Sequence, residues 1–158
     1  MRRYLAFAAV LLAIGFALPT HSKNANPAAS AAAQNWIAAW NSHDTAKWAA
    51  YFTSDVYYED VAFGQISRNL DEGKKFAGET FEDTPDLKLE LENSSFDGDH
   101  GTIQWILTGT DKGFFKTGKP FKVRGVSIIT VKNGKISRSV DYYDSATIMK
   151  QVGLLPAS

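Results

Sequence analysis

The amino-acid sequence predicts an α+β fold in one domain, in which three helices cover one face of a curved, mostly antiparallel sheet. Segments with helical spacing of apolar residues dominate the first half of the chain, and segments that alternate apolar and polar residues dominate the second half. The chain has 158 residues, enough for one domain with a sizeable core. A sheet bent around helices encloses a cone-shaped cavity, where we expect a hydrophobic small molecule to bind.

The first 22 residues are expected to lie outside this domain. Arg2 and Arg3 precede an almost unbroken apolar run at 4–18, and a polar break follows. This order is typical of a secretory signal peptide, and the run is shorter than the roughly 20 residues of a spanning helix. We therefore expect a periplasmic or secreted protein, with an uncleaved anchor as the alternative. Residues 23–29 would form a short tether and 30–156 the domain.

Charge and composition exclude several classes of partner. Removing the first 22 residues takes two of the 17 basic residues and none of the 17 acidic ones, leaving a net charge of about −2. Lysine and arginine do not cluster, so neither nucleic acid nor a membrane surface is expected as a partner. The chain has no cysteine, phosphate loop, dinucleotide fingerprint or metal-type histidine spacing. We expect no cofactor and no metal.

Helices are expected in three segments that precede the main run of strands. Apolar residues recur at helical spacing in residues 29–41: Ala33, Trp36, Ile37 and Trp40. A second short helix, capped by Ser42 or Asp44, would carry Trp48, Tyr51 and Phe52. Residues 66–83 also have helical spacing, although two glycines weaken the pattern there.

Strands are expected at 56–60 and then throughout the second half of the chain, at 87–92, 102–110, 121–132 and 136–143. Leucine alternates with charged residues in the second of these, as in a half-buried strand. The Asn133-Gly134 pair predicts a tight hairpin. Residues 111–120 are expected to form a loop, and a short amphipathic helix at 145–152 would follow the last strand.

Two adjacent carboxylates, Glu59 and Asp60, lie in an aromatic and apolar stretch of the first strand. Successive side chains on a strand point to opposite faces, so one carboxylate should face water and the other the interior. A carboxylate in apolar surroundings is unfavourable unless it is paired, protonated or used in chemistry. Asp60 is thus a candidate general base that removes a proton from a carbon beside a carbonyl. The alternative is a strand-end aspartate that caps the next loop.

Two further residues are candidate catalytic groups. Asp141 lies on the same face of the last strand as Ser139 and Tyr143, where the carboxyl and phenol groups could polarise a carbonyl. An outer surface is the alternative for this face. His43 lies at the junction of two helices and is a candidate proton relay, or else a solvated loop histidine.

The substrate-binding wall is expected to be largely aromatic. Trp48 is interpreted as a core residue. Arg124 lies in the middle of a strand, where it would face solvent or reach a buried acid such as Asp60 or Asp141. The expected pocket residues are Trp36, Trp40, Tyr58, Phe63, Trp105, Arg124 and Tyr143.

Three segments resemble the SnoaL-like polyketide cyclases, a family of the nuclear transport factor 2-like superfamily that also holds the ketosteroid isomerases. The segments are AWNSHDTAKWAAYFTSDVYYEDVAFG, GTIQWILTGTDKGFFKTGKPFKVRGVSIITVKNGKI and DYYDSATIMKQVGLLP. The resemblance covers about residues 30–156 and implies a cone-shaped barrel of curved sheet closed by three helices. It also implies that Asp60 is the inward, proton-shuttling base and Glu59 the solvated residue.

The match to the ketosteroid isomerases is incomplete. Their first-helix tyrosine corresponds to Trp36, and their second aspartate falls near Val126 or Ser127, where this sequence has no acid. The resemblance therefore favours cofactor-free, cyclase- or isomerase-like chemistry on an apolar carbonyl compound over steroid isomerisation. The alternatives are non-catalytic binding of an apolar molecule and a dimerising interaction module. A homodimer is expected, paired through an open sheet face such as that of Thr102 and Gln104.

Overall fold

Six strands form one sheet in the computed structural model, which describes residues 27–156. The strands are β1 (Phe52–Asp60), β2 (Gln65–Ser67), β3 (Lys88–Asp97), β4 (His100–Thr110), β5 (Pro120–Lys132) and β6 (Lys135–Tyr143). The helices in the described part are α1 (Pro27–Asn41), α2 (Thr45–Ala50), α3 (Leu70–Asp83) and α4 (Ser145–Gln151). The strand order is β2-β1-β6-β5-β4-β3, and the neighbours are antiparallel except for the parallel pair β1 and β6.

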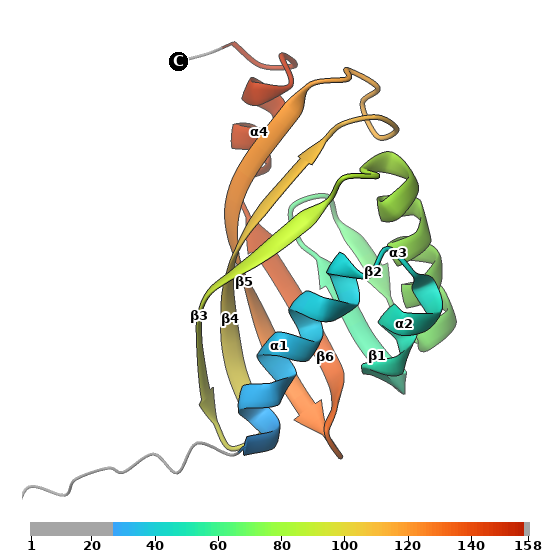
Figure 1. Ribbon diagram of the computed structural model, residues 1–158, viewed down its shortest axis with the longest axis vertical. Helices are drawn as coiled ribbons and strands as arrows, with labels where there is room; N and C mark the ends of the chain where they lie inside the picture. Colours follow the sequence, from blue (N-terminus) through green and yellow to red (C-terminus); the bar gives the residue numbers. More distant parts are fainter. Residues whose placement is uncertain (1–26, 157–158) are drawn as a thin grey trace, which may run out of the picture.

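Helices α1, α2 and α3 lie on one side of the curved sheet, and α4 lies near one end of it (Figure 1). Strand β3 contains a register shift between Leu91 and Asn93, an irregularity of the kind that bends a strand. The predicted α+β fold, with helices on one face of a mostly antiparallel sheet, is confirmed. The curvature leaves room between the sheet and α1 and α3 for the site described below.

Aromatic packing holds α2 and α3 against the start of β1. The Trp48 ring stacks on Phe52 with a centroid separation of 3.9 Å. A Cβ atom at Gly73 of α3 would lie only 2.7 Å from the Trp48 ring. The glycine that weakens the helical pattern in the sequence is therefore required by the packing, because any side chain there would displace Trp48.

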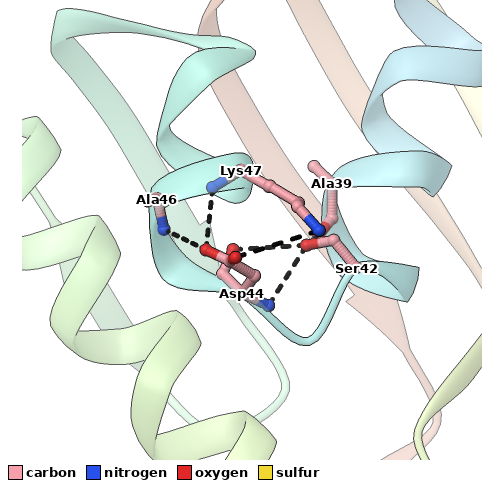
Figure 2. A network of polar contacts seen from close by, with 5 residues as sticks. All are labelled: Ala39, Ser42, Asp44, Ala46 and Lys47. Atoms are coloured by element: carbon pink, nitrogen blue, oxygen red, sulfur yellow. Dashed lines mark hydrogen bonds and ion pairs between the residues drawn. The ribbon is translucent and has the colours of Figure 1, made fainter.

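A polar turn connects α1 to α2 (Figure 2). Of the two expected caps, Asp44 is the one that caps α2: its carboxylate accepts hydrogen bonds from the backbone N–H groups of Ala46 at 2.8 Å and Lys47 at 3.1 Å. The Ser42 hydroxyl donates to the carbonyl of Ala39 at 2.7 Å, at the end of α1. These bonds fix the angle at which α2 leaves α1 and so position Trp48.

Several boundaries differ from the sequence-based expectation. Strand β1 begins at Phe52, which pairs with Ile136 of β6 rather than ending the second helix. Strand β2 was not expected; its three residues pair with the end of β1. Helix α1 begins at Pro27, so residues 27–29 of the expected tether are helical.

The expected signal peptide at 1–22 lies outside the described residues. Within 27–156, no helix combines the length and apolar character needed to cross a bilayer. The same part of the chain holds no group of histidine and acidic side chains arranged to bind a metal ion.

Candidate active site

A cavity of about 140 Å³ lies between the sheet and helices α1 and α3. Its wall is mainly aromatic and aliphatic, and it includes four aspartates: Asp60, Asp83, Asp111 and Asp141. The other lining residues are Trp36, Trp40, Tyr58, Phe63, Gln65, Phe76, Thr80, Thr84, Leu87, Leu89, Trp105, Leu107, Phe114, Phe115, Phe121, Tyr143 and Ile148. An apolar cavity with a few convergent polar groups is the usual form of a small-molecule site.

The parallel pairing of β1 with β6 places two carboxyl groups side by side. Asp60 is the register partner of Asp141, and Tyr58 is the partner of Ser139. All four residues are buried, as alternation along each strand requires for side chains on the inner face. Glu59 alternates with this face, and its carboxylate accepts a hydrogen bond from the Tyr57 hydroxyl at 2.8 Å.

Asp60 is buried at the end of β1, with 8% of its surface exposed. One carboxylate oxygen accepts from the Tyr143 hydroxyl at 2.7 Å, and the other accepts from the backbone N–H of Phe63 at 3.1 Å. Burial raises the pKa of Asp60, and these hydrogen bonds partly oppose the rise because they favour the ionised form. Burial and the Asp60 charge also raise the pKa of the Tyr143 phenol, so that hydroxyl remains a donor.

Asp141 lies deeper and is more strongly perturbed. Its carboxyl group accepts hydrogen bonds from the hydroxyls of Tyr58, Ser127 and Ser139, the last at 3.0 Å. Burial nevertheless raises the pKa of Asp141 to about 7, and the charge of Asp60 contributes to the rise. Asp141 can therefore gain or lose a proton near neutral pH, which is a property of catalytic acids and bases.

Two tryptophans that line the cavity are hydrogen-bonded to serines. The indole N–H of Trp36, on α1, donates to the Ser139 hydroxyl oxygen at 3.2 Å, and that of Trp105, on β4, donates to Ser127 at 2.9 Å. The two indole rings stack with centroids 5.9 Å apart. Trp105 lies over Gly125 of β5, where a Cβ atom would come within 2.2 Å of the ring.

The β1–β2 loop and the loop at 111–119 form part of the cavity wall, through Phe63 and through Asp111, Phe114 and Phe115. Phe63 contacts Phe114 at a centroid distance of 5.0 Å and Phe115 at 6.1 Å. The buried Asp111 carboxylate holds the second loop by accepting from the backbone N–H groups of Phe115 at 2.9 Å and Thr117 at 2.8 Å. Phe114 is 53% exposed, so this part of the wall reaches the solvent, and we refer to it as the mouth.

The structure brings most of the predicted site residues together. The cavity is lined by both candidate aspartates and by six of the expected pocket residues: Trp36, Trp40, Tyr58, Phe63, Trp105 and Tyr143. The sequence also correctly placed Trp48 in the core, where it is fully buried.

His43 and Arg124 are not part of this cavity, contrary to expectation. His43 is exposed and does not line the cavity; its Nε2 donates to the backbone carbonyl of the lining residue Leu87 at 2.8 Å. Arg124 points to the other face of β5, where its guanidinium pairs with Glu92 at 2.9 Å. Of the two alternatives for Arg124, solvent is the correct one, because the alternation that buries Val123 turns Arg124 outward.

Ser127 and the polar role of Ser139 were not predicted from the sequence. No acid lies near Ser127 along the chain, but Ser127 is the register partner of Asp141, so the neighbouring strand supplies the acid. A short polar side chain on an inner strand face is a weak signal, and only the strand pairing reveals what it contacts.

The fold is that of solved nuclear transport factor 2-like and ketosteroid isomerase-like proteins. Comparisons of the sequence with known proteins identify the family. The model of the SnoaL-like polyketide cyclase family matches residues 30–152. The chain is 30% identical over 94 residues to the cyclase aurE of Calcarisporium arbuscula, covering 59% of this chain and 69% of that protein. This chain belongs to the SnoaL-like polyketide cyclase family.

Solved structures share the same fold. A putative SnoaL-like polyketide cyclase from Jannaschia sp. CCS1 superposes with a TM-score of 0.71 at 20% identity, over 82% of this chain and 94% of that one. IdmH, a putative polyketide cyclase from Streptomyces antibioticus, gives a TM-score of 0.69 at 20% identity, over 78% and 97%. At these identities the likeness establishes the fold alone.

Proposed function

We propose that this protein is a cofactor-free acid–base enzyme, of the cyclase or isomerase type, that acts on an apolar carbonyl compound. Membership of a polyketide cyclase family supports this class of activity. The observation that carries the proposal is the pair of buried carboxyl groups, Asp60 and Asp141, at the wall of an apolar cavity. Their environments differ, so one can act as base while the other holds a proton.

In the proposed reaction, the Asp60 carboxylate removes a proton from the carbon beside a substrate carbonyl. The C–H electron pair then forms an enolate, which attacks a second carbonyl of the same molecule and closes a ring. The new alkoxide takes back the proton from Asp60, so the enzyme returns to its starting state. In an isomerisation the proton is returned to another carbon instead. The Tyr143 hydroxyl holds Asp60 in place, and protonated Asp141 supplies a hydrogen bond to the developing oxyanion.

The lining also supports the proposed substrate class. Among the described residues that line the cavity, none is a lysine, arginine or histidine. Aromatic walls favour a flat, apolar molecule, and the aspartates disfavour an anionic one. Excluding water from such a site strengthens the hydrogen bonds that stabilise the enolate.

Exchange of the α-protons of an apolar ketone tests this proposal without knowledge of the natural substrate. β-Tetralone in D₂O, followed by proton NMR, should lose its α-proton signals faster with the protein than in buffer alone. Exchange at the buffer rate, with binding of β-tetralone visible as line broadening, would contradict catalysis. That outcome would favour the alternative, a non-catalytic binder of apolar compounds.

Export and dimerisation are further parts of the proposal. The apolar N-terminal segment supports export, which fractionation of the host cell would test. Ile128 and Tyr142, on the sheet face opposite the cavity, are 47% and 45% exposed and support pairing through that face. Sedimentation should give twice the chain mass, and a monomer at micromolar concentration would contradict the dimer.

A further inference from the structure

Two tryptophan–serine pairs converge on the Asp141 carboxyl group. An indole N–H can only donate a hydrogen bond, so each serine oxygen must act as the acceptor in its pair. The bonds are Trp36 to Ser139 at 3.2 Å and Trp105 to Ser127 at 2.9 Å. Each serine hydroxyl proton is then left for a different acceptor, and both serines donate to Asp141.

We propose that Trp36 and Trp105 are positioning residues for Asp141, each orienting one serine hydroxyl so that its proton points at the Asp141 carboxyl group. The two indoles come from different elements, α1 and β4, and the two serines from β6 and β5. Both tryptophans also line the cavity. The residues that shape the wall thus also determine the hydrogen bonding of a carboxyl group beside it.

The arrangement sets the protonation of Asp141. Burial and the charge of Asp60 favour the neutral carboxyl group, whereas the donors favour the carboxylate. The titratable groups that act on Asp141 are Tyr58 and Asp60 from β1 and Tyr143 from β6. The groups that α1 and β5 contribute to this network are uncharged: Trp36, which donates to Ser139, and Ser127, which donates to Asp141. Loss of a serine donor should therefore move the pKa of Asp141 upward from about 7.

The test is a pH titration of the Asp141 side-chain carboxyl carbon by NMR in the whole protein. Ser139→Ala should raise the pKa of Asp141 by about one unit, as for loss of one hydrogen bond to a charged group. Trp36→Phe should raise it by less, because the hydroxyl remains but is free to rotate. The double variant should match Ser139→Ala alone, since the indole acts through the serine. An unchanged pKa in Trp36→Phe, or additive effects, would overturn the proposal for this pair.

Trp48→Phe is the matched control. Its indole N–H is also buried but has no hydrogen-bond partner, and Trp48 does not line the cavity. The pKa of Asp141 should not change in this variant. A rise equal to that in Trp36→Phe would show that loss of packing, not loss of the bond to serine, changes the pKa, and would overturn the proposal.

Serine variants keep the test valid if Trp36→Phe does not fold. Ser127→Ala removes one hydroxyl and should also raise the pKa of Asp141, and the Ser127→Ala and Ser139→Ala effects should add because the pairs are separate. No rise in either alanine variant would overturn the inference.

The inference concerns the same site as the proposed function and deepens it, but the titration needs no substrate. The titration can therefore support the role of the tryptophans even if the protein does not exchange the ketone protons. Equally, the ketone exchange can succeed even if the tryptophans do not affect the pKa of Asp141.

Discussion

Asp60 and Asp141 face the same cavity from neighbouring parallel strands, and each is hydrogen-bonded to its own tyrosine. Asp60 accepts from Tyr143, and Asp141 accepts from Tyr58. Asp141 is the more deeply buried carboxyl group, and its pKa rises to about 7. Two carboxyl groups in contact with one cavity but with different proton affinities can divide the roles of base and acid.

The first prediction concerns stability and pH. The pKa of Asp141 rises from 3.8 to about 7 on folding. Between these values the unfolded chain has released a proton that the folded chain keeps, so the free energy of unfolding falls as pH rises through this window. Above it the loss is complete, at about 4 kcal/mol. In Asp141→Asn, the free energies of unfolding measured with urea at pH 5 and pH 8 should differ less than they do in the wild type.

The exposed Glu79→Gln variant of α3 is the control and should keep the wild-type pH dependence. If the free energy of unfolding of Asp141→Asn changed with pH as much as that of the wild type, groups other than Asp141 would cause the pH dependence. Asp60, whose pKa is also raised, contributes in the same direction.

The second prediction concerns Gly125. A methyl group there would lie 2.2 Å from the Trp105 ring, so Gly125→Ala must displace the indole and lose its bond to Ser127. We expect destabilisation by about 2 kcal/mol in chemical unfolding. Gly78→Ala is the matched control: the new methyl group would meet only Thr45 at 3.4 Å. That change should stabilise α3 by about 0.5–1 kcal/mol. Equal effects of the two variants would contradict the packing described for Trp105.

The third prediction concerns the mouth. Phe114→Ala removes the ring that packs on Phe63 while leaving the buried wall intact. The dissociation constant for β-tetralone, measured by tryptophan fluorescence, should rise about fivefold, which corresponds to roughly 1 kcal/mol of lost apolar contact. Ile128→Ala, a similarly exposed apolar position on the opposite sheet face, should leave binding unchanged. Equal weakening in both variants would place the ligand elsewhere.

The fourth prediction separates the cavity from the two candidates outside it. His43 has a left-handed backbone at φ +50°, which asparagine tolerates, so His43→Asn removes the imidazole without straining the backbone. Arg124→Gln removes the ion pair with Glu92. Both variants should exchange the α-protons of β-tetralone at the wild-type rate. A tenfold loss in either would mean that the side chain reaches the substrate, contrary to its position.

Much of the fold follows from local sequence patterns. Alternation in β3 and β4 and the Asn133-Gly134 turn indicate the antiparallel sheet, and helical spacing indicates α1 and α3. The start of β1 was missed because Trp48, Tyr51 and Phe52 also fit helical spacing. The ring of Phe52 does stack on Trp48, but from a strand. Strand β2 is too short to carry a pattern.

The site was only partly predictable, because its contacts depend on strand register. Counting back from the Asn133-Gly134 turn would place Ser127 opposite Val140. A register shift between Thr130 and Val131 moves its partner to Asp141. A shift of one residue exchanges the inner and outer faces, so this irregularity decides which side chain meets Ser127. The parallel pairing of β1 with β6, which joins Asp60 to Asp141, also has no local signal.

The most direct test of the central claim is the rate of α-proton exchange of β-tetralone in Asp60→Asn. The asparagine keeps the shape of the side chain but cannot take a proton, so exchange should fall at least 100-fold while the dissociation constant stays within a few-fold of wild type. In the wild type the rate should also fall as pH is lowered through the raised pKa of Asp60, because protonation removes the base. An Asp60→Asn protein that binds β-tetralone and exchanges its protons at the wild-type rate would contradict Asp60 as the base.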